Sequence, residues 1–130
     1  MPTRQETFDT VARALVKQGQ PALNPGGWCS YRGVGGMRCA VGHLIPDELY
    51  SRNMEHVGAS DGRVAHVLVD LGHDVALCKA LQVAHDLVRR DTHAMWVEAW
   101  ALSMRGVAEL FKLSTSVLDE ALAARGAGNQ

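Results

Sequence analysis

TRQETFDTVARALVKQ, residues 3–18, is the stretch that sets the fold class. Its apolar residues recur at the i, i+3, i+4 and i+7 spacing of one helix face. These residues are Phe8, Val11, Ala12, Leu15 and Val16. Thr3 and Glu6 stand three apart, as in a capping box that satisfies the first free amides of a helix. Gly19 and Pro21 follow, so we expect an amphipathic helix over residues 3–18.

The same periodicity predicts four more helices further along the chain. They cover residues 62–71, 74 to about 90, 91 or 92 to about 112, and 114–125. Gly72 and Gly126 stand where a helix would end, and Asp74 stands where one would begin. Either Asp91 or Thr92 caps the fourth of the five. These spans predict a mainly α fold, a compact bundle of about five helices in a single domain over residues 1–130.

Residues 20–38 differ, since five glycines and two prolines exclude a long helix there. We expect a Gly-rich loop or a small hairpin, with Trp28–Tyr31 as one arm and residues 32–36 as its turn. Cys39–Ile45 is expected as a short helix that stops at Pro46, because the residue before a proline is pushed out of the α region. A further helical turn is expected from Pro46 to Tyr50.

The composition excludes several classes of protein. Lys and Arg number 13 against 14 Asp and Glu, a net charge of -1, so the basic excess typical of nucleic-acid binding is missing. No apolar run is long enough for a membrane span, and the first residues do not resemble a signal peptide. Three cysteines without an export signal argue against a disulfide framework. We therefore expect a cytoplasmic protein.

The residues that point most clearly to chemistry are Cys29, Cys39 and His43. On a helix, Cys39 and His43 would share one face because they are four apart. Cys29 precedes them across the Gly-rich loop. Thiolate and imidazole are the preferred zinc donors, and a structural site needs four ligands. His85 is our choice for the fourth.

Cys78 and His73 are the alternatives for that fourth ligand. Such a zinc ion would tie the loop, which has few aliphatic residues to bury, to the helical frame. The competing interpretation treats the cysteines as small buried hydrophobes and the histidines as partners of backbone carbonyls.

Two motifs resemble a group of small phage- and prophage-encoded proteins of unknown function. The first is CSYRG at residues 29–33 followed by MRCAVGHLIPDELY at residues 37–50, and the second is LQVAHD at residues 81–86. The usual pattern of that group has cysteine where this chain has His43. The resemblance implies the ligand set Cys29, Cys39, His43 and His85, because an exchange of cysteine for histidine preserves zinc-donor chemistry. It implies no activity.

The function we predict is that of a phage or prophage accessory protein, a zinc-stabilised protein–protein interaction module that modulates a host factor. One alternative is a helix-turn-helix DNA-binding regulator over residues 107–122, in which Ser114–Ser116 would open the recognition helix. Asp119 and Glu120 on that helix would repel phosphates, so we expect no nucleic-acid partner.

The second alternative is a zinc-dependent hydrolase with a water on an open coordination position. His85, Asp86 or Glu48 would then act as the base. A nucleophilic Cys39 with His43 as base would need a third, orienting residue, which the sequence does not indicate. We therefore expect a protein without catalytic residues.

Overall fold

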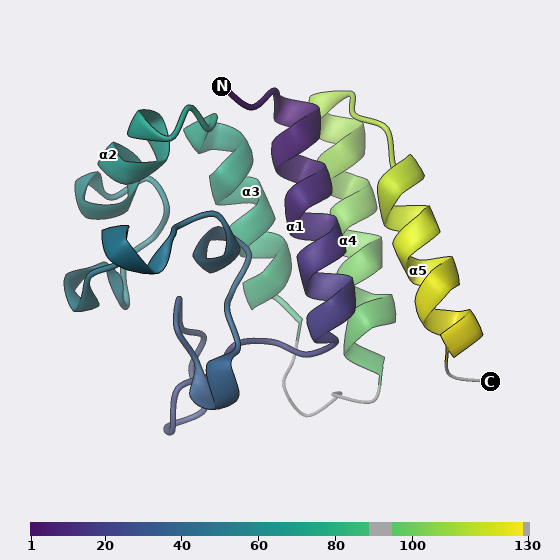
Figure 1. The fold of residues 1–130 in the computed structure, drawn as a ribbon, viewed down its shortest axis with the longest axis horizontal. Coiled ribbons are helices and arrows are strands. Elements are labelled where there is room, and N and C mark those ends of the chain that lie inside the picture. The colour runs from purple at the N-terminus through teal and green to yellow at the C-terminus, as the bar shows by residue number, and fades with distance from the viewer. Residues whose placement is uncertain (89–94, 129–130) are drawn as a thin grey trace.

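The computed structural model describes residues 1–88 and 95–128. Five α-helices form most of this part of the chain (Figure 1). They are α1 (Arg4–Gln18), α2 (Gly62–Asp70), α3 (Val75–Asp86), α4 (Trp96–Phe111) and α5 (Ser116–Gly128). Single 3-10 turns lie at Val34–Gly36, Val41–His43, Asp47–Leu49 and Arg52–Met54. The described residues contain isolated β-bridges but no strand, which confirms the expected mainly α fold.

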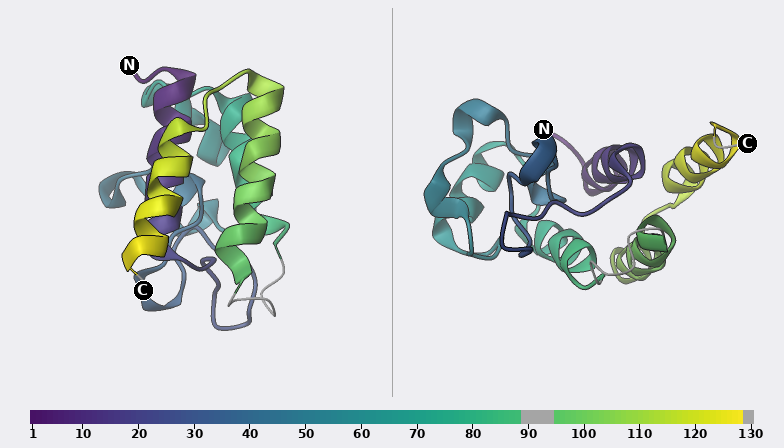
Figure 2. Two further views of the ribbon diagram at one scale, coloured as in Figure 1. Left: turned by 90° about the vertical axis from the view of Figure 1, so that its right-hand side faces the viewer. Right: turned by 90° about the horizontal axis from the view of Figure 1, so that it is seen from below.

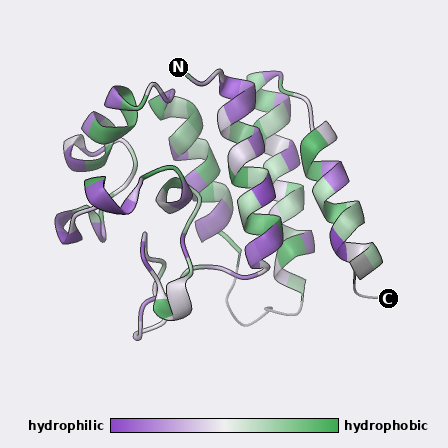
Figure 3. Cartoon of the chain, in the orientation of Figure 1, coloured by the Kyte–Doolittle hydropathy of each residue, from purple (hydrophilic) through white to green (hydrophobic). Residues whose placement is uncertain are grey.

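Four of the helices form a bundle, in which α1 packs against α5 and α3 packs against α4 (Figures 1 and 2). α2 lies on the other side of α3 (Figure 1), and the 3-10 turn Val41–His43 contacts both α1 and α3. The bundle helices carry both hydrophobic and hydrophilic residues, as amphipathic helices do (Figure 3). Their largest fully buried side chains include Phe8, Leu15, Leu77, Leu81, Trp96, Trp100, Met104 and Leu118.

The start and end of α1 follow the sequence signals. The amide of Glu6 donates to Thr3 Oγ1 at 3.0 Å, and the amide of Thr3 donates to Glu6 Oε1 at 3.0 Å. Gly19 ends the helix in the left-handed region at φ 73°, where only glycine is unstrained. The predicted apolar stripe from Phe8 to Val16 is buried, so the capping box and the periodicity are both confirmed.

Of the predicted boundaries of α3 and α5, some agree with the structure and others do not. Asp74 caps α3 by accepting the amide of Leu77 at 2.9 Å, as predicted. α3 then ends at Asp86 instead of continuing to about residue 90, and the predicted caps Asp91 and Thr92 lie outside the described residues. α5 begins at Ser116 and continues through Gly126, so the prediction that Gly126 ends this helix is wrong.

The expected helix over Cys39–Ile45 is only a single 3-10 turn, Val41–His43. The amide of His43 donates to the carbonyl of Cys39 at 3.0 Å, but Pro46 has no N–H with which to extend this turn to the carbonyl of Gly42. The Arg32 guanidinium donates to that carbonyl instead, at 2.8 Å. The expected hairpin is likewise reduced to two isolated antiparallel bridges, Leu23 with Cys29 and Arg32 with Arg38.

Two tryptophans stack at the start of α4. The rings of Trp96 and Trp100 are nearly parallel, at 7°, with centroids 5.5 Å apart, and both side chains are fully buried. His85 meets Trp96 edge-on at 5.7 Å. Within the described residues neither indole N–H has a hydrogen-bond acceptor. This stack fills the space between α3 and α4 and holds His85 from one side.

Candidate functional site

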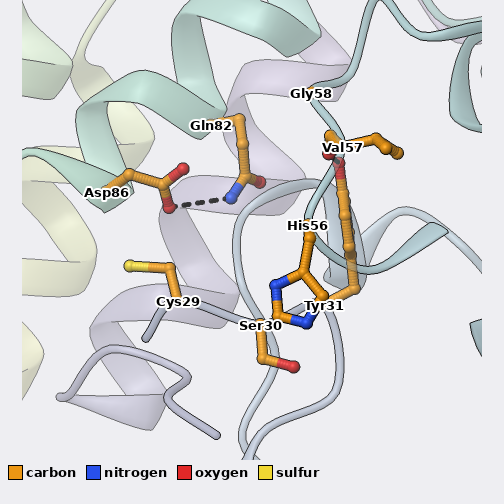
Figure 4. A pocket seen from close by; sticks show the side chains of 8 residues that line it. All are labelled: Cys29, Ser30, Tyr31, His56, Val57, Gly58, Gln82 and Asp86. Atoms are coloured by element: carbon orange, nitrogen blue, oxygen red, sulfur yellow. Dashed lines mark hydrogen bonds between the residues drawn. The ribbon is translucent and has the colours of Figure 1, made fainter. Parts of the chain in front are cut away.

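Three potential metal donors meet where the Gly-rich loop reaches the end of α3. One donor atom each from Cys29, His85 and Asp86 lies within 4.8 Å of the other two. Cys29 and Asp86 also line a cavity of about 270 Å³ (Figure 4). The other residues around this cavity are Ser30, Tyr31, His56, Val57, Gly58 and Gln82. Sulfur, imidazole and carboxylate are all ligands that Zn²⁺ accepts.

The hydrogen bonds of His85 assign the tautomer of its neutral ring. Its Nε2 accepts the backbone amide of Ala22 at 3.1 Å, so the proton of the neutral ring must lie on Nδ1. That Nδ1–H donates to Asp86 Oδ1 at 2.8 Å, and the Gln82 amide donates to the same oxygen at 2.9 Å. Both ring nitrogens are therefore engaged, and a metal ion bound directly to His85 would have to replace one of these bonds.

Cys39 and His43 lie outside this group of donors. The Cys39 sulfur accepts the amide of Gly42 at 3.3 Å, and complete burial raises the pKa of the thiol, which keeps it protonated. His43 Nε2 lies 2.9 Å from Gln18 Oε1. Burial, followed by the nearby Arg38 charge, lowers the pKa of His43 to about 4. Of the four predicted ligands, the structure thus brings together only Cys29 and His85.

Cys78 and His73, the two alternatives for the fourth ligand, also lie outside the group of Cys29, His85 and Asp86. Cys78 is buried in the core of the bundle, and burial raises the pKa of its thiol to about 12. His73 Nδ1 lies 2.7 Å from the Thr7 hydroxyl, and burial lowers the pKa of this histidine. Both residues behave as packed structural side chains in this arrangement.

Hydrogen bonds fix the loop that a metal was expected to fix. Arg32 donates to the carbonyls of Gly42 and Ile45 at 2.8 and 2.7 Å, stacks on the ring of Tyr50, and pairs with Asp47 at 3.1 Å. This one side chain joins three separate stretches of residues 31–50. The sequence does not reveal that Arg32 holds this loop, because the carbonyls that it binds belong to no recognisable motif.

Glu55 is a second centre of hydrogen bonds. Its carboxylate accepts from the Ser30 hydroxyl at 3.0 Å, from the amides of Tyr31 and Arg32 at 2.9 and 3.2 Å, and from the Tyr50 hydroxyl at 2.6 Å. Burial alone would raise the pKa of this carboxyl, but the hydrogen bonds from these four groups lower it overall. The sequence holds no signal for this role.

Two glutamines connect the loop to the helices. Gln18, at the end of α1, accepts the amide of Arg38 at 3.0 Å and donates to its carbonyl at 2.9 Å. Gln82 of α3 accepts the amide of Val41 at 3.0 Å. Together with the bond from Ala22 to His85, these contacts attach residues 22–41 to α1 and α3.

A different feature lies on the outer side of the bundle, where α3 and α4 form an apolar groove of about 500 Å³. Val83, Leu87 and Leu110 are exposed there, Leu87 to 70% and Leu110 to 74%. Small residues form part of the lining, and among the residues that the structure describes Lys79 is the one charged residue in it. The full lining is Ala76, Lys79, Ala80, Val83, Ala84, Leu87, Ser103, Gly106, Val107, Leu110 and Phe111. Large exposed apolar groups gathered in one groove are typical of a protein-binding surface.

The segment predicted to resemble a helix-turn-helix has a different geometry. Helices of that motif cross steeply, at about 90–120°. Here α4 and α5 run beside each other in opposite directions (Figures 1 and 2). Ser114 is held by Gln5 of α1, whose side chain bonds both its amide and its carbonyl. Asp119 pairs with Arg105 at 2.7 Å. The start of α5 is therefore engaged with the rest of the bundle.

Comparison of the chain with family models, with curated proteins and with solved structures gave no match. None of the helices in the described residues combines the length and apolar character needed to cross a bilayer.

Proposed function

We propose that this protein is an interaction module without catalytic residues, and that the groove between α3 and α4 binds another protein chain. The observation that carries the proposal is that three exposed apolar side chains, Val83, Leu87 and Leu110, gather in one groove. Burial of such side chains stabilises a complex by roughly 25 cal/mol per Å² of apolar surface before the costs of association.

The shape of the groove favours a helix as the bound element. Two helices form its walls, and Ala80, Ala84 and Gly106 are small enough for a third helix to come close. The resemblance to phage proteins would make a host protein the partner. The apolar lining of the groove would suit a protein partner whether or not the chain comes from a phage.

Site-specific photo-crosslinking in cells tests this proposal. A photoreactive amino acid at Leu87 should form adducts with another protein chain, which mass spectrometry then identifies. Val69 is the matched control, because it is an exposed apolar residue of α2, away from the groove. Adducts that form equally at both positions, or at neither, would contradict the proposal.

We also propose that Cys29, His85 and Asp86 bind Zn²⁺. The convergence of three different donors on one point favours this second candidate. Binding through His85 has to release its bond to Ala22 or to Asp86, so we expect weaker binding than in a closed site of four thiolates. Asp86 would remain oriented by Gln82.

Titration with Co²⁺ tests the site through the charge-transfer absorption of a cobalt–thiolate bond. We expect this band in the unmodified protein, its loss in Cys29→Ser, and its retention in Cys78→Ser, whose thiol is buried elsewhere in the bundle. A melting temperature unchanged by Zn²⁺, together with no cobalt band, would rule the site out.

A further inference from the structure

The cavity beside the donor group of Cys29, His85 and Asp86 has a further histidine in its wall. His56 lines this cavity together with Cys29 and Asp86, and Figure 4 shows its imidazole among the side chains that surround the space. A tetrahedral zinc site takes four ligands, and imidazole is one of the donors that Zn²⁺ accepts. The three donors that already converge are one fewer than such a site needs, and His56 offers the missing type of atom.

The other polar side chains around the cavity are already used by the fold. The Ser30 hydroxyl lies 3.0 Å from a carboxylate oxygen, and the Tyr31 hydroxyl donates to a backbone carbonyl at 2.7 Å. Both polar atoms of the Gln82 amide are engaged as well, one as acceptor and the other as donor. Within the described residues the imidazole of His56 makes no hydrogen bond or ion pair. Its ring nitrogens are therefore available to an ion in the cavity.

The two neighbours of His56 in the chain hold it close to the segment that carries Cys29. The carboxylate of Glu55 accepts the amide of Tyr31 at 2.9 Å, and the carbonyl of Val57 accepts the Tyr31 hydroxyl at 2.7 Å. Tyr31 is only two residues from Cys29. Because both neighbours are attached to this one residue, the backbone of His56 is fixed relative to Cys29. Rotation about its two side-chain torsions is then enough to bring the ring toward the other donors.

His56 has a backbone conformation that costs free energy. Its φ is 66°, in the left-handed region, where in the described part of the chain Lys112 is the one other residue that is not glycine. Glycine adopts this conformation without strain, whereas a residue with a Cβ atom does not. A histidine at such a position is explained if its side chain has a task that glycine could not perform.

We infer that His56 is the fourth ligand of the zinc site and closes its coordination sphere. This inference rests on the proposed function, because it completes the site of Cys29, His85 and Asp86. A closed set of four protein ligands is the arrangement of a structural zinc ion, with no position for a reactive water. Such an ion would join residues 55–58 to α3 and to the Gly-rich loop, three segments that are far apart in the sequence.

Cobalt spectra separate the fourth ligand from the thiolate. Tetrahedral Co²⁺ has much stronger visible d–d bands than octahedral Co²⁺, while the Cys29 thiolate adds its own charge-transfer absorption. In His56→Gly we expect the d–d bands to weaken, because water replaces the imidazole, and the charge-transfer band to remain. The affinity for Zn²⁺ should fall about 10-fold or more. The control is His66→Ala, an exposed histidine of α2, whose spectra and affinity should match those of the unmodified protein.

The melting temperature of the same variant distinguishes a ligand from a residue that only supports the fold. Glycine adopts a φ of 66° without strain, so metal-free His56→Gly should melt at about the same temperature as the metal-free protein. Zn²⁺ should raise the melting temperature of the variant less.

Unchanged d–d bands, zinc affinity and zinc-induced stabilisation in His56→Gly would overturn the inference and leave the proposed zinc site with three protein ligands. The absence of a cobalt–thiolate band in the unmodified protein would remove both the zinc site and its fourth ligand.

Discussion

Replacement of Glu55 by alanine should destabilise the protein strongly, although this residue lies outside the five α-helices. Its carboxylate accepts four hydrogen bonds, two of them from the backbone amides of Tyr31 and Arg32. An amide that loses its acceptor in a partly buried position costs about 1–3 kcal/mol, and a hydrogen bond to a charged group contributes about 1.5–3 kcal/mol. Because water can reach part of this site, we expect a loss of about 3–5 kcal/mol from the free energy of unfolding.

That loss is large compared with the free energy of unfolding of a typical domain, which is roughly 5–15 kcal/mol. Urea unfolding at neutral pH, followed by far-ultraviolet circular dichroism, measures it. Glu55→Gln keeps one acceptor oxygen and should lose about half as much. The control is Glu48→Ala, an exposed acidic side chain in the same region, for which we expect a change within about 0.5 kcal/mol.

The pH dependence gives a second measurement on the same residue. The pKa of Glu55 is lower in the folded protein than in the unfolded chain. The carboxylate therefore stabilises the folded state fully at a pH above its pKa in the unfolded chain, and this stabilisation is lost as the pH falls through its pKa in the folded protein. Glu55→Ala should therefore weaken the acid sensitivity of the protein. If Glu55→Ala costs less than about 1 kcal/mol at neutral pH, the four hydrogen bonds do not hold the loop, and the explanation given for its order fails.

Two other predictions concern the same region. Gly42→Ala should cost about 2–4 kcal/mol in urea unfolding, because the added Cβ would overlap the carbonyl oxygen of Tyr31, and an unchanged midpoint would contradict this packing. His43 has a pKa of about 4 in the folded protein against 6.5 ordinarily, so the unfolded chain binds the proton first and stability falls as the pH drops from 6.5 toward 4. The melting temperature of His43→Gln should fall less steeply over that range, and parallel curves would show that His43 is not the titrating group.

The helices were predictable because their signals are local. The apolar periodicity of α1 and its capping residues Thr3 and Glu6 lie within a few residues of one another, and the structure shows the same caps. The order of residues 20–50 was not predictable in the same way. Arg32 and Glu55 act on backbone groups of other segments, and backbone groups leave no trace in a sequence pattern.

The candidate metal site shows the same limit. One turn joins Cys39 to His43, because the amide of His43 donates to the carbonyl of Cys39 at 3.0 Å. The sulfur of Cys39 nevertheless accepts from the amide of Gly42, and the imidazole of His43 bonds to Gln18. Cys29 and His85 do meet, but the third donor beside them is Asp86, the neighbour of His85 in the chain. Asp86 therefore joins Cys29 and His85 in the donor set, while Cys39 and His43 lie outside it.

The tryptophans give the protein two separate optical signals. Because the rings of Trp96 and Trp100 are nearly parallel and in contact, their electronic transitions couple, and a circular-dichroism couplet should report this stacked pair in the core of the bundle. Trp28 lies apart from them in the Gly-rich loop, and its side chain is 70% exposed, so its emission reports that loop. An experiment that follows both signals can therefore tell whether the loop and the bundle come apart together or one after the other.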